Sequence, residues 1–251
     1  QLLPFHVMQT RIGRKNVTKK NLQDAPLAMI CYDLLEDNGV DIRHMSLQER
    51  RNILDSILTA AKEKFPELPM MLSPTVVCNT WEEVASERLI AREQNCEGLM
   101  LKRKTSSYKT GRRRGDWWKW KVDPLSIDGV LIYAQRGHGR RANLYTDFTF
   151  AVWDGEELVP FTKAYSGLTD KELVEVDSWV KKHTKEKFGP VRSVTPELVF
   201  EIGFEGINPS PRHKSGVALR FPRILRWRKD KSIKDANTKD DLMDLLKINN
   251  G

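Results

Sequence analysis

The 251-residue sequence has little that could form disulfides, hold a structural metal or enter a membrane. Its three cysteines, Cys31, Cys78 and Cys96, are far apart and fit no CxxC pattern, and its five histidines form no HExxH pair. A disulfide framework or a zinc site is therefore not expected, and a reducing compartment is favoured. No apolar run approaches the length of a membrane span, and no signal peptide opens the sequence. We expect a monomer without a membrane partner, located in a bacterial-type cytoplasm or otherwise inside a cell.

What the sequence does have is positive charge. It carries 42 Lys and Arg against 34 Asp and Glu, a formal net charge of +8. This balance favours anionic partners, of which nucleic acid is the most common, although a basic but otherwise ordinary protein fits the charge equally well. Charged residues make up 30% and hydrophobic residues 39% of the chain, which is typical of a globular protein rather than a disordered tail.

The first half of the sequence mixes strand and helix patterns. We expect a buried strand from Leu27 to Leu35, ended by the turn Asp-Asn-Gly. A helix should follow Ser46, whose side chain can form a capping box with Glu49 three residues later. A second helix should begin at Asn79 or Thr80, and the segment CEGLMLK should form a short strand before a basic loop.

The second half has a different pattern, dominated by strands. Several strands with alternating or continuous apolar residues surround a single expected helix, DKELVEVDSWVKKHTKEKF. Short strands around one helix suggest a small closed barrel of the OB type, which binds nucleic acid on its strand face. The change of pattern at Asp123 and Pro124 predicts a domain boundary there, with residues 1–123 and 124–251 on either side. The fold class expected for the whole chain is α+β.

The segment GDWWKWKVDP alternates tryptophan with lysine in a predicted strand. Successive side chains of a strand point to opposite faces, so the segment has two distinct faces. One face contains Trp118, Trp120 and Val122, and the other contains Trp117, Lys119 and Lys121. Taken alone, lysines on one strand face are most often a solvated edge that prevents further strand pairing.

Other charged residues argue for a phosphate site instead. Glu97 and Lys102 lie at the two ends of the EGLMLK strand, and the loop that follows holds several cations. The segment RFPRILRWRKDK, near the end of the chain, interleaves six more cations with apolar residues. Cations against packed tryptophans need an anionic partner, and phosphate suits both the point charge of lysine and the forked guanidinium of arginine.

Four of these segments, in this order, resemble motifs of a known family. The segments YDLLEDNG, EGLMLK, YKTGRRRGDWWKWKVD and RFPRILRWRKDK are similar to motifs III, IV, V and VI of the ATP-dependent DNA ligases, which are covalent nucleotidyltransferases. The resemblance implies that residues 1–123 are the C-terminal part of an adenylation domain with mixed sheets and helices. Residues 124–251 would then form an OB-fold β-barrel domain.

The resemblance also implies roles for residues of motifs III to V. Tyr32 would stack on the adenine of ATP, which we favour over the alternative of a tyrosine packed in a core strand. Glu97 would help to hold Mg²⁺, and Lys102 would contact phosphate. Lys119 and Lys121 would meet the α-phosphate and neutralise the charge that develops there during transfer.

Several arginines have roles implied by the same motifs. Arg113 would bind the nucleotide from the basic loop. Arg50 and Arg51 match motif IIIa, and either could reach the nucleotide or belong to a solvated helix face; Arg51 is our candidate. The remaining basic residues would contact DNA phosphates or only solvent, and they are Arg112, Arg114, Lys109 and Arg136.

The last motif, RxDK, comprises Arg228, Asp230 and Lys231. In the family this motif closes over ATP and orients the pyrophosphate leaving group, so a hinge near Asp123 would serve a lid motion.

The motif that starts the family's chemistry is absent from this sequence. No KxDG occurs, and the nearest segments, SIDG and VWDG, lack the lysine that attacks ATP. We expect the chain to be the C-terminal part of a ligase; a natural protein that has lost its nucleophile is the other possibility. The full enzyme would use ATP and Mg²⁺ to adenylate itself and would seal nicked double-stranded DNA. The chain alone should not form the covalent adenylate.

Two other interpretations stay open at this point, and a third is not favoured. An RNA ligase or capping-type nucleotidyltransferase shares motifs III to V and would differ in its nucleic-acid substrate. A non-catalytic OB-type nucleic-acid-binding module would show steep salt dependence without ATP dependence. A plain basic structural protein does not explain why the cations gather in the motif segments.

Overall fold

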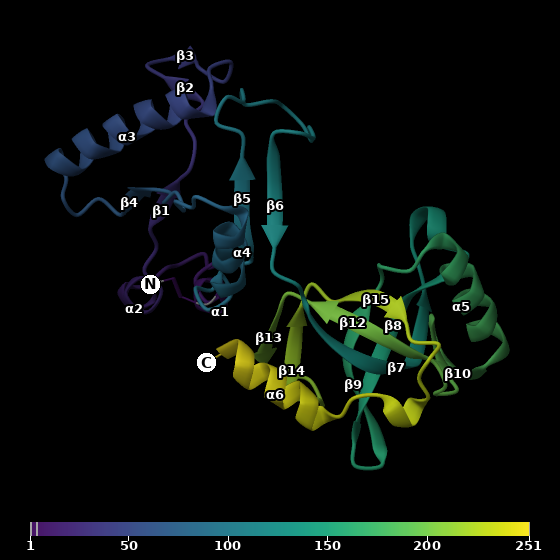
Figure 1. Ribbon diagram of the computed structural model, residues 1–251. Helices are drawn as coiled ribbons and strands as arrows, with labels where there is room; N and C mark the ends of the chain where they lie inside the picture. Colours follow the sequence, from purple (N-terminus) through teal and green to yellow (C-terminus); the bar gives the residue numbers. More distant parts are fainter. Residues whose placement is uncertain (1, 4, 251) are drawn as a thin grey trace. The chain divides into compact units, whose positions relative to one another are not determined.

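The chain is described here by a computed structural model that covers residues 2–3 and 5–250. It divides into two compact units, Gln1–Val122 and Asp123–Gly251, each described by itself. Figure 1 labels the helices and strands of both units. Within the described part of the chain, none of the helices combines the length and the apolar character needed to cross a membrane.

Unit 1 combines helices with short strand pairs. Parallel β1 and β4 form one pair, and antiparallel β2–β3 and β5–β6 form two more. In chain order its elements are α1 (Phe5–Gln9), α2 (Lys19–Asp24), β1 (Met29–Cys31), β2 (Glu36–Asp37), β3 (Val40–Asp41), α3 (Leu47–Lys64), β4 (Met70–Leu72), α4 (Trp81–Ile90), β5 (Gly98–Lys102) and β6 (Trp117–Lys121).

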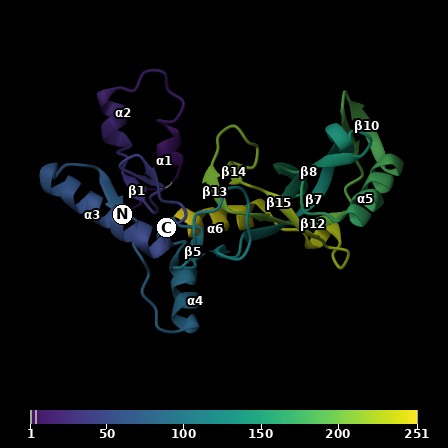
Figure 2. The same ribbon diagram turned by 90° about the horizontal axis from the view of Figure 1, so that it is seen from above.

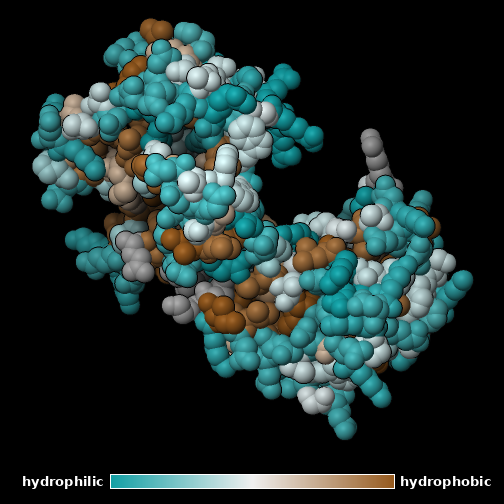
Figure 3. Space-filling model, viewed as in Figure 1, coloured by the Kyte–Doolittle hydropathy of each residue, from teal (hydrophilic) through white to brown (hydrophobic). Residues whose placement is uncertain are grey.

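The expectation of a buried strand from Leu27 to Leu35 is wrong in both length and burial. Only Met29–Cys31 forms a strand, and the side chains of Leu27, Met29 and Ile30 are exposed. Among the described residues β1 pairs only with β4, so little of unit 1 covers it. Two residues after the strand, Asp33 pairs with a buried arginine. Apolar patches lie among hydrophilic residues on the face shown in Figure 3.

The two expected helices of unit 1 are confirmed. Helix α3 begins after Ser46, whose side chain accepts from the Glu49 N–H while the Glu49 carboxylate accepts from the Ser46 N–H. Helix α4 is capped by Thr80 rather than Asn79. The inward face of α3 includes Leu54 and Leu58, both buried, which fixes the helix in unit 1.

Unit 2 is built on a seven-stranded sheet and a further strand pair. Its elements are β7 (Leu125–Arg136), η1 (Gly139–Arg141), β8 (Tyr145–Asp154), β9 (Glu157–Ala164), α5 (Asp170–Lys182), β10 (Thr184–Phe188), β11 (Val191–Val194), β12 (Val199–Phe204), β13 (Gly206–Pro209), β14 (Val217–Arg220), β15 (Arg223–Trp227), η2 (Ile233–Asp235) and α6 (Lys239–Asn250). The long strand β7 is central, with β8 on one edge and β11 and β12 on the other.

The expected closed barrel is not completed by strand pairing within the described residues. Strands β9, β10 and β15 each end the sheet, and the segment just after β9 meets β15 through a backbone hydrogen bond from the Ile224 N–H to the Ser166 carbonyl (2.8 Å). Gly167 follows Ser166 with φ +117°, and a Cβ there would overlap the Ile224 carbonyl. The chain therefore leaves strand geometry where the last ladder would form, and the result is a curled sheet in which two of these ends touch.

One core fills the curled sheet. Phe148, Phe150 and Phe200 are fully buried in it, together with Leu242 of α6. Helix α5 packs on β8 and α6 on β13, and both views place α6 beside β13 and β14 (Figures 1 and 2). The helix expected over 170–188 ends at Lys182, because the following residues form a strand that pairs with β11 across a Gly-Pro turn.

Candidate functional site

The strands β5 and β6 build the candidate site of unit 1. Their antiparallel register places Lys102 opposite Trp117, Met100 opposite Lys119, and Gly98 opposite Lys121. Opposed residues in a strand pair project to the same side, so Lys102, Lys119 and Lys121 share one face. The strand pair thus collects three ammonium groups and one tryptophan ring on that face.

Gly98 allows β5 to approach β6 very closely. Its φ is +132°, and a Cβ there would lie 2.3 Å from the Trp120 carbonyl oxygen and 2.7 Å from the Lys121 Cα. Only glycine fits this position, because the neighbouring atoms are backbone. The close approach brings Glu97 to Lys121, with 2.9 Å between Oε2 and Nζ and with about two fifths of each side chain exposed. Sequence reasoning placed these two residues on adjacent strands but did not predict this contact.

Lys102 is held between two aromatic rings. Its Nζ lies 4.3 Å from the ring centroid of Tyr32 and 4.1 Å from that of Trp117, and the two rings meet edge to face at 6.4 Å. Desolvation between these rings lowers the pKa of the Lys102 ammonium below its usual 10.5, although the nearby Asp33 opposes the shift. Tyr32 stays 50% exposed, so one part of its side chain contacts the ammonium while another part is open.

The opposite face of β6 is packed rather than charged. Trp120 meets Trp81 edge to face at 6.4 Å, and the Arg88 guanidinium lies 5.5 Å from the Trp120 ring centroid. Arg88 Nε also donates to the Lys121 carbonyl (2.6 Å). Trp120 and Arg88 therefore support the strand from behind, whereas Trp118 is largely exposed.

The two arginines of α3 have different environments. Arg50 is completely buried and forms a two-pronged ion pair with Asp33, with Nε–Oδ1 at 2.8 Å and Nη2–Oδ2 at 2.9 Å. Arg51 is only partly buried and donates to the carbonyls of Tyr32 (3.2 Å) and Ser73 (2.7 Å). Arg50 therefore has no surface for a ligand, while Arg51 lies beside the aromatic residue of the site.

The loop between β5 and β6 carries exposed cations. Lys109 Nζ pairs with Asp116 (2.5 Å), and Arg103 with the same carboxylate (3.3 Å). The hydrogen bond from Lys109 holds the pKa of Asp116 below its usual value. Within the described part of the chain, the three consecutive loop arginines form no ion pair and are exposed; they are Arg112, Arg113 and Arg114.

In unit 2 the RxDK residues form one ion cluster around Asp128. Arg228 donates through Nη1 to Asp128 (3.0 Å) and through Nη2 to Asp230 (2.7 Å), and Lys231 Nζ lies 2.6 Å from Asp128. Hydrogen bonding to Arg228 lowers the pKa of Asp230, and the same bond is the main cause that raises the pKa of Arg228. Sequence reasoning missed Asp128, whose signal is a single carboxylate inside the apolar strand SIDGVLI.

Two further residues lie at the ends of strands in unit 2. Arg136 ends β7, with its guanidinium 5.7 Å from the Tyr145 ring centroid. Phe221 connects β14 to β15 with φ +52° and is 63% exposed, and the Arg220 guanidinium lies 5.0 Å from its ring centroid. A positive φ is strained for a bulky residue, and strain of this kind often marks a functional position. The signal in the sequence is an aromatic residue between arginine and proline.

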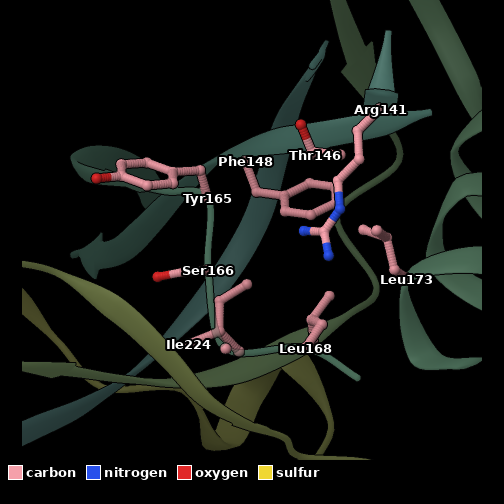
Figure 4. A pocket seen from close by; sticks show the side chains of 9 residues that line it. Arg141, Thr146, Phe148, Tyr165, Ser166, Leu168, Leu173 and Ile224 are labelled. Atoms are coloured by element: carbon pink, nitrogen blue, oxygen red, sulfur yellow. The ribbon is translucent and has the colours of Figure 1, made fainter. Parts of the chain in front are cut away.

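A pocket of unit 2 contains none of the predicted site residues. Nine residues line it, among them Arg141, Thr146, Tyr165, Ser166 and Leu168, and Figure 4 shows the Arg141 guanidinium projecting between Phe148 and Leu173.

The described residues also contain no group of three or more His, Cys, Asp or Glu side chains that could hold a metal by themselves.

Comparisons with known proteins identify the family to which both units are similar. Residues 1–121 match the family described as ATP dependent DNA ligase domain, and residues 141–231 match the ATP dependent DNA ligase C terminal region. A probable DNA ligase of Koribacter versatilis is 39% identical over 95% of this chain and 44% of its own length. The chain thus spans less than half the length of that relative.

Solved structures share the fold at lower identity. A chain named Pmar-Lig_PreS3 aligns over 91% of this chain and 49% of its own, with a TM-score of 0.67 and 16% identity. A solved Lig E DNA ligase aligns over 88% of this chain and 71% of its own, with a TM-score of 0.59 and 18% identity. The α+β fold class expected from the sequence is confirmed by these matches and by the elements described above.

Proposed function

Because the chain belongs to the ATP-dependent DNA ligase family, we propose that it supplies nucleotide-binding and DNA-binding surfaces of such an enzyme. The observation that carries the proposal is the shared face of β5 and β6, which presents Lys102, Lys119 and Lys121. Tyr32 packs against Lys102 at this face, and Glu97 pairs with Lys121. We assign residues 1–123 to the C-terminal part of the adenylation domain and residues 124–251 to the OB-fold domain. The complete enzyme would adenylate its own lysine with ATP, transfer AMP to the 5′-phosphate of a nick, and join it to the 3′-hydroxyl.

In this proposal the strand face binds the base and the α-phosphate of ATP. The open part of Tyr32 stacks on adenine, and the ammonium of Lys102 approaches phosphate from between its two aromatic neighbours. Lys119 and Lys121 neutralise the charge on the phosphoryl oxygens while the bond to the leaving group breaks. Arg113 and Arg51 bind the nucleotide from the loop and from α3.

Glu97 fits a divalent ion of the magnesium type. Mg²⁺ is commonly held by one or two carboxylates, with waters and substrate phosphates completing its octahedron. The half-exposed carboxylate of Glu97, beside the phosphate-facing lysines, supplies such a ligand. When bound there, the ion would add positive charge where the phosphates gather, and Lys121 would share Glu97 with it.

The RxDK cluster and the basic loop complete the proposal. Arg228, Asp230 and Lys231 orient the pyrophosphate leaving group, as members of a unit that closes over ATP and later opens. DNA phosphates are contacted by exposed cations, which are Lys109, Arg112, Arg114 and Arg136. Nicked double-stranded DNA is the proposed partner, and we propose that the protein works as a monomer inside the cell.

Adenylation of the chain gives the first test of the proposal. The 251-residue chain is incubated with labelled ATP and Mg²⁺, and its intact mass is measured. No AMP adduct is expected, because the chain has no KxDG lysine. A stable adduct would show that another nucleophile is present and would overturn the assignment as a C-terminal part.

Nick sealing gives the second test. The chain is joined to the N-terminal part of the Koribacter versatilis relative, and sealing of a nicked duplex is followed on a gel. Lys119→Ala or Lys121→Ala should slow nucleotidyl transfer about 100- to 1,000-fold, the usual cost of removing one group that stabilises developing charge. Lys104→Ala, an exposed lysine of the neighbouring loop, is the matched control and should keep full activity. Full activity in both strand variants would reduce the strand to an ordinary solvated edge.

A further inference from the structure

Arg50 is a fully buried cation whose side chain joins three separate segments of unit 1. Besides its two bonds to Asp33, its Nη1 donates to the Met45 carbonyl (2.5 Å) and to the Ser106 carbonyl (3.2 Å). Its guanidinium also lies 5.8 Å from the ring centroid of Tyr108. One side chain thus contacts the segment after β1, the turn before α3 and the loop after β5.

Each of these segments leads directly into the candidate nucleotide site. Asp33 follows Tyr32, the proposed adenine-binding residue. Ser106 belongs to the loop that connects Lys102 to Trp117, and the Leu47 N–H of α3 binds the same Ser106 carbonyl (2.8 Å). The loop then continues to Tyr108, whose ring packs against Trp117 edge to face at 5.4 Å. The position of Tyr32 relative to Lys102 and Trp117 therefore depends on what holds Asp33 and Ser106.

Stability alone does not explain a buried ion pair of this kind. Removing two charges from water costs several kcal/mol per ion, and apolar residues of similar volume often give equal or greater stability. The pair instead provides fixed geometry, because a guanidinium that binds a carboxylate through two parallel bonds allows little rotation. All of the contacts of Arg50 lie inside the protein, so it acts through other residues and not on a ligand.

We propose that the Arg50–Asp33 pair is a positioning device that sets the Tyr32 ring against Lys102 and Trp117 for nucleotide binding. The inference rests on the proposed function, because it takes the strand face as the nucleotide site. It goes beyond that proposal by assigning a role to the arginine of α3 that no ligand can reach. Arg51 contributes from the adjacent position by binding the Tyr32 carbonyl.

The central test replaces both members of the pair and keeps the net charge. Asp33→Leu combined with Arg50→Met fills the site with apolar groups of similar size. The Met45 and Ser106 carbonyls and the Leu34 N–H each lose a hydrogen-bond partner, so unit 1 should stay folded with a urea midpoint below that of the original chain. The control removes an exposed pair of the same kind, Arg43 with Asp41 (2.6 Å), as Arg43→Gln with Asp41→Asn. That pair makes no side-chain contact with Tyr32, Lys102 or Trp117.

Two measurements are made on the 251-residue chain. The first is the affinity for AMP, followed by NMR shifts, which should fall at least tenfold in the paired variant and stay within twofold in the control. The second is the pKa of the Lys102 ammonium by NMR titration, which should return towards 10.5 when Tyr32 and Trp117 no longer desolvate it. Of the charged groups that act on Lys102, Asp33 raises its pKa more than Arg50 lowers it, so removing both would by itself lower this pKa, and a rise towards 10.5 can come only from lost desolvation.

The outcomes separate this inference from the proposed function. A folded paired variant with unchanged AMP affinity and unchanged Lys102 pKa would overturn the positioning role. If the original chain bound no AMP, the nucleotide-site proposal would fail, while the Lys102 pKa would still report on the geometry. If the paired variant did not fold, Arg50→Lys decides, because it keeps the charge and loses the two-pronged bond. Original AMP affinity in Arg50→Lys would then overturn the inference.

Discussion

Replacing Gly98 by alanine should damage the candidate site more than the same change at any other glycine of unit 1. The new Cβ would lie 2.3 Å from the Trp120 carbonyl oxygen and 2.7 Å from the Lys121 Cα, and both are backbone atoms that no side-chain rotation can move. The residue would also keep φ near +132°, which alanine strongly disfavours. The strand pair must therefore separate, and Glu97 should move away from Lys121.

The cost has two parts of known size. Holding a non-glycine residue in such a conformation costs about 1–3 kcal/mol. Forcing an extra methyl group into a packed contact costs about 1–3 kcal/mol more. Together they amount to a large fraction of the roughly 5–15 kcal/mol that stabilises a typical domain. We expect Gly98→Ala to lower the urea midpoint of unit 1 well below that of the original chain.

Gly111→Ala provides the matched control. Gly111 also has a positive φ, of +73°, but a Cβ there would meet nothing within 4 Å. This variant should therefore lose only about 1–2 kcal/mol, the conformational part of the cost. Both are measured by urea unfolding through tryptophan fluorescence, with amide hydrogen exchange at Met100 and Lys119 to identify β5 and β6. The close-approach argument is wrong if Gly98→Ala costs unit 1 no more than Gly111→Ala.

Three further predictions concern a lysine, a helix cap and a turn. The pKa of Lys102 is lowered on folding, so between the folded pKa and 10.5 unfolded chains hold a proton that folded chains have lost. The contribution of Lys102 to the free energy of unfolding therefore rises as pH increases through this range. Urea titrations at several pH values should show that Lys102→Met removes this rise. Ser46→Ala should cost about 0.5–2 kcal/mol of unfolding free energy. Hydrogen bonds from Ser46 lower the pKa of Glu49. The stabilisation by this cap is therefore complete above pH 4.5 and is lost as pH falls through the lower pKa of the folded state. A difference in unfolding free energy between the original chain and Ser46→Ala that does not change with pH would contradict this account. Phe221→Gly should raise the melting temperature of unit 2 by removing strain, and an unchanged or lower melting temperature would show that the positive φ is not a source of strain.

The parts of the structure that the sequence predicted well depend on local chemistry. The capping box of Ser46 and Glu49 needs only residues three positions apart, and the alternating segment around Lys119 and Lys121 needs only the two-residue period of a strand. Both features were placed correctly because neighbours along the chain determine them.

The parts that the sequence did not predict depend on distant partners. The segment after Leu27 is apolar enough for a buried strand, but burial requires packing on its faces, and among the described residues only β4 pairs with it. The contact between Asp33 and Arg50 joins positions 17 residues apart, and the one between Asp128 and Arg228 joins positions 100 apart. Charge pairs at such separations leave no periodic signal in a single sequence.

The ion cluster of unit 2 changes how its cations should respond to salt. Arg228 and Lys231 already hold the carboxylates of Asp128 and Asp230, so a phosphate that binds them has to displace a carboxylate of the same chain. Few dissolved counterions are released by such an exchange, whereas exposed arginines such as Arg113 release theirs. Phosphate affinity at the cluster should therefore depend only weakly on ionic strength, and we expect a steeper salt dependence for phosphate contacts made by the basic loop.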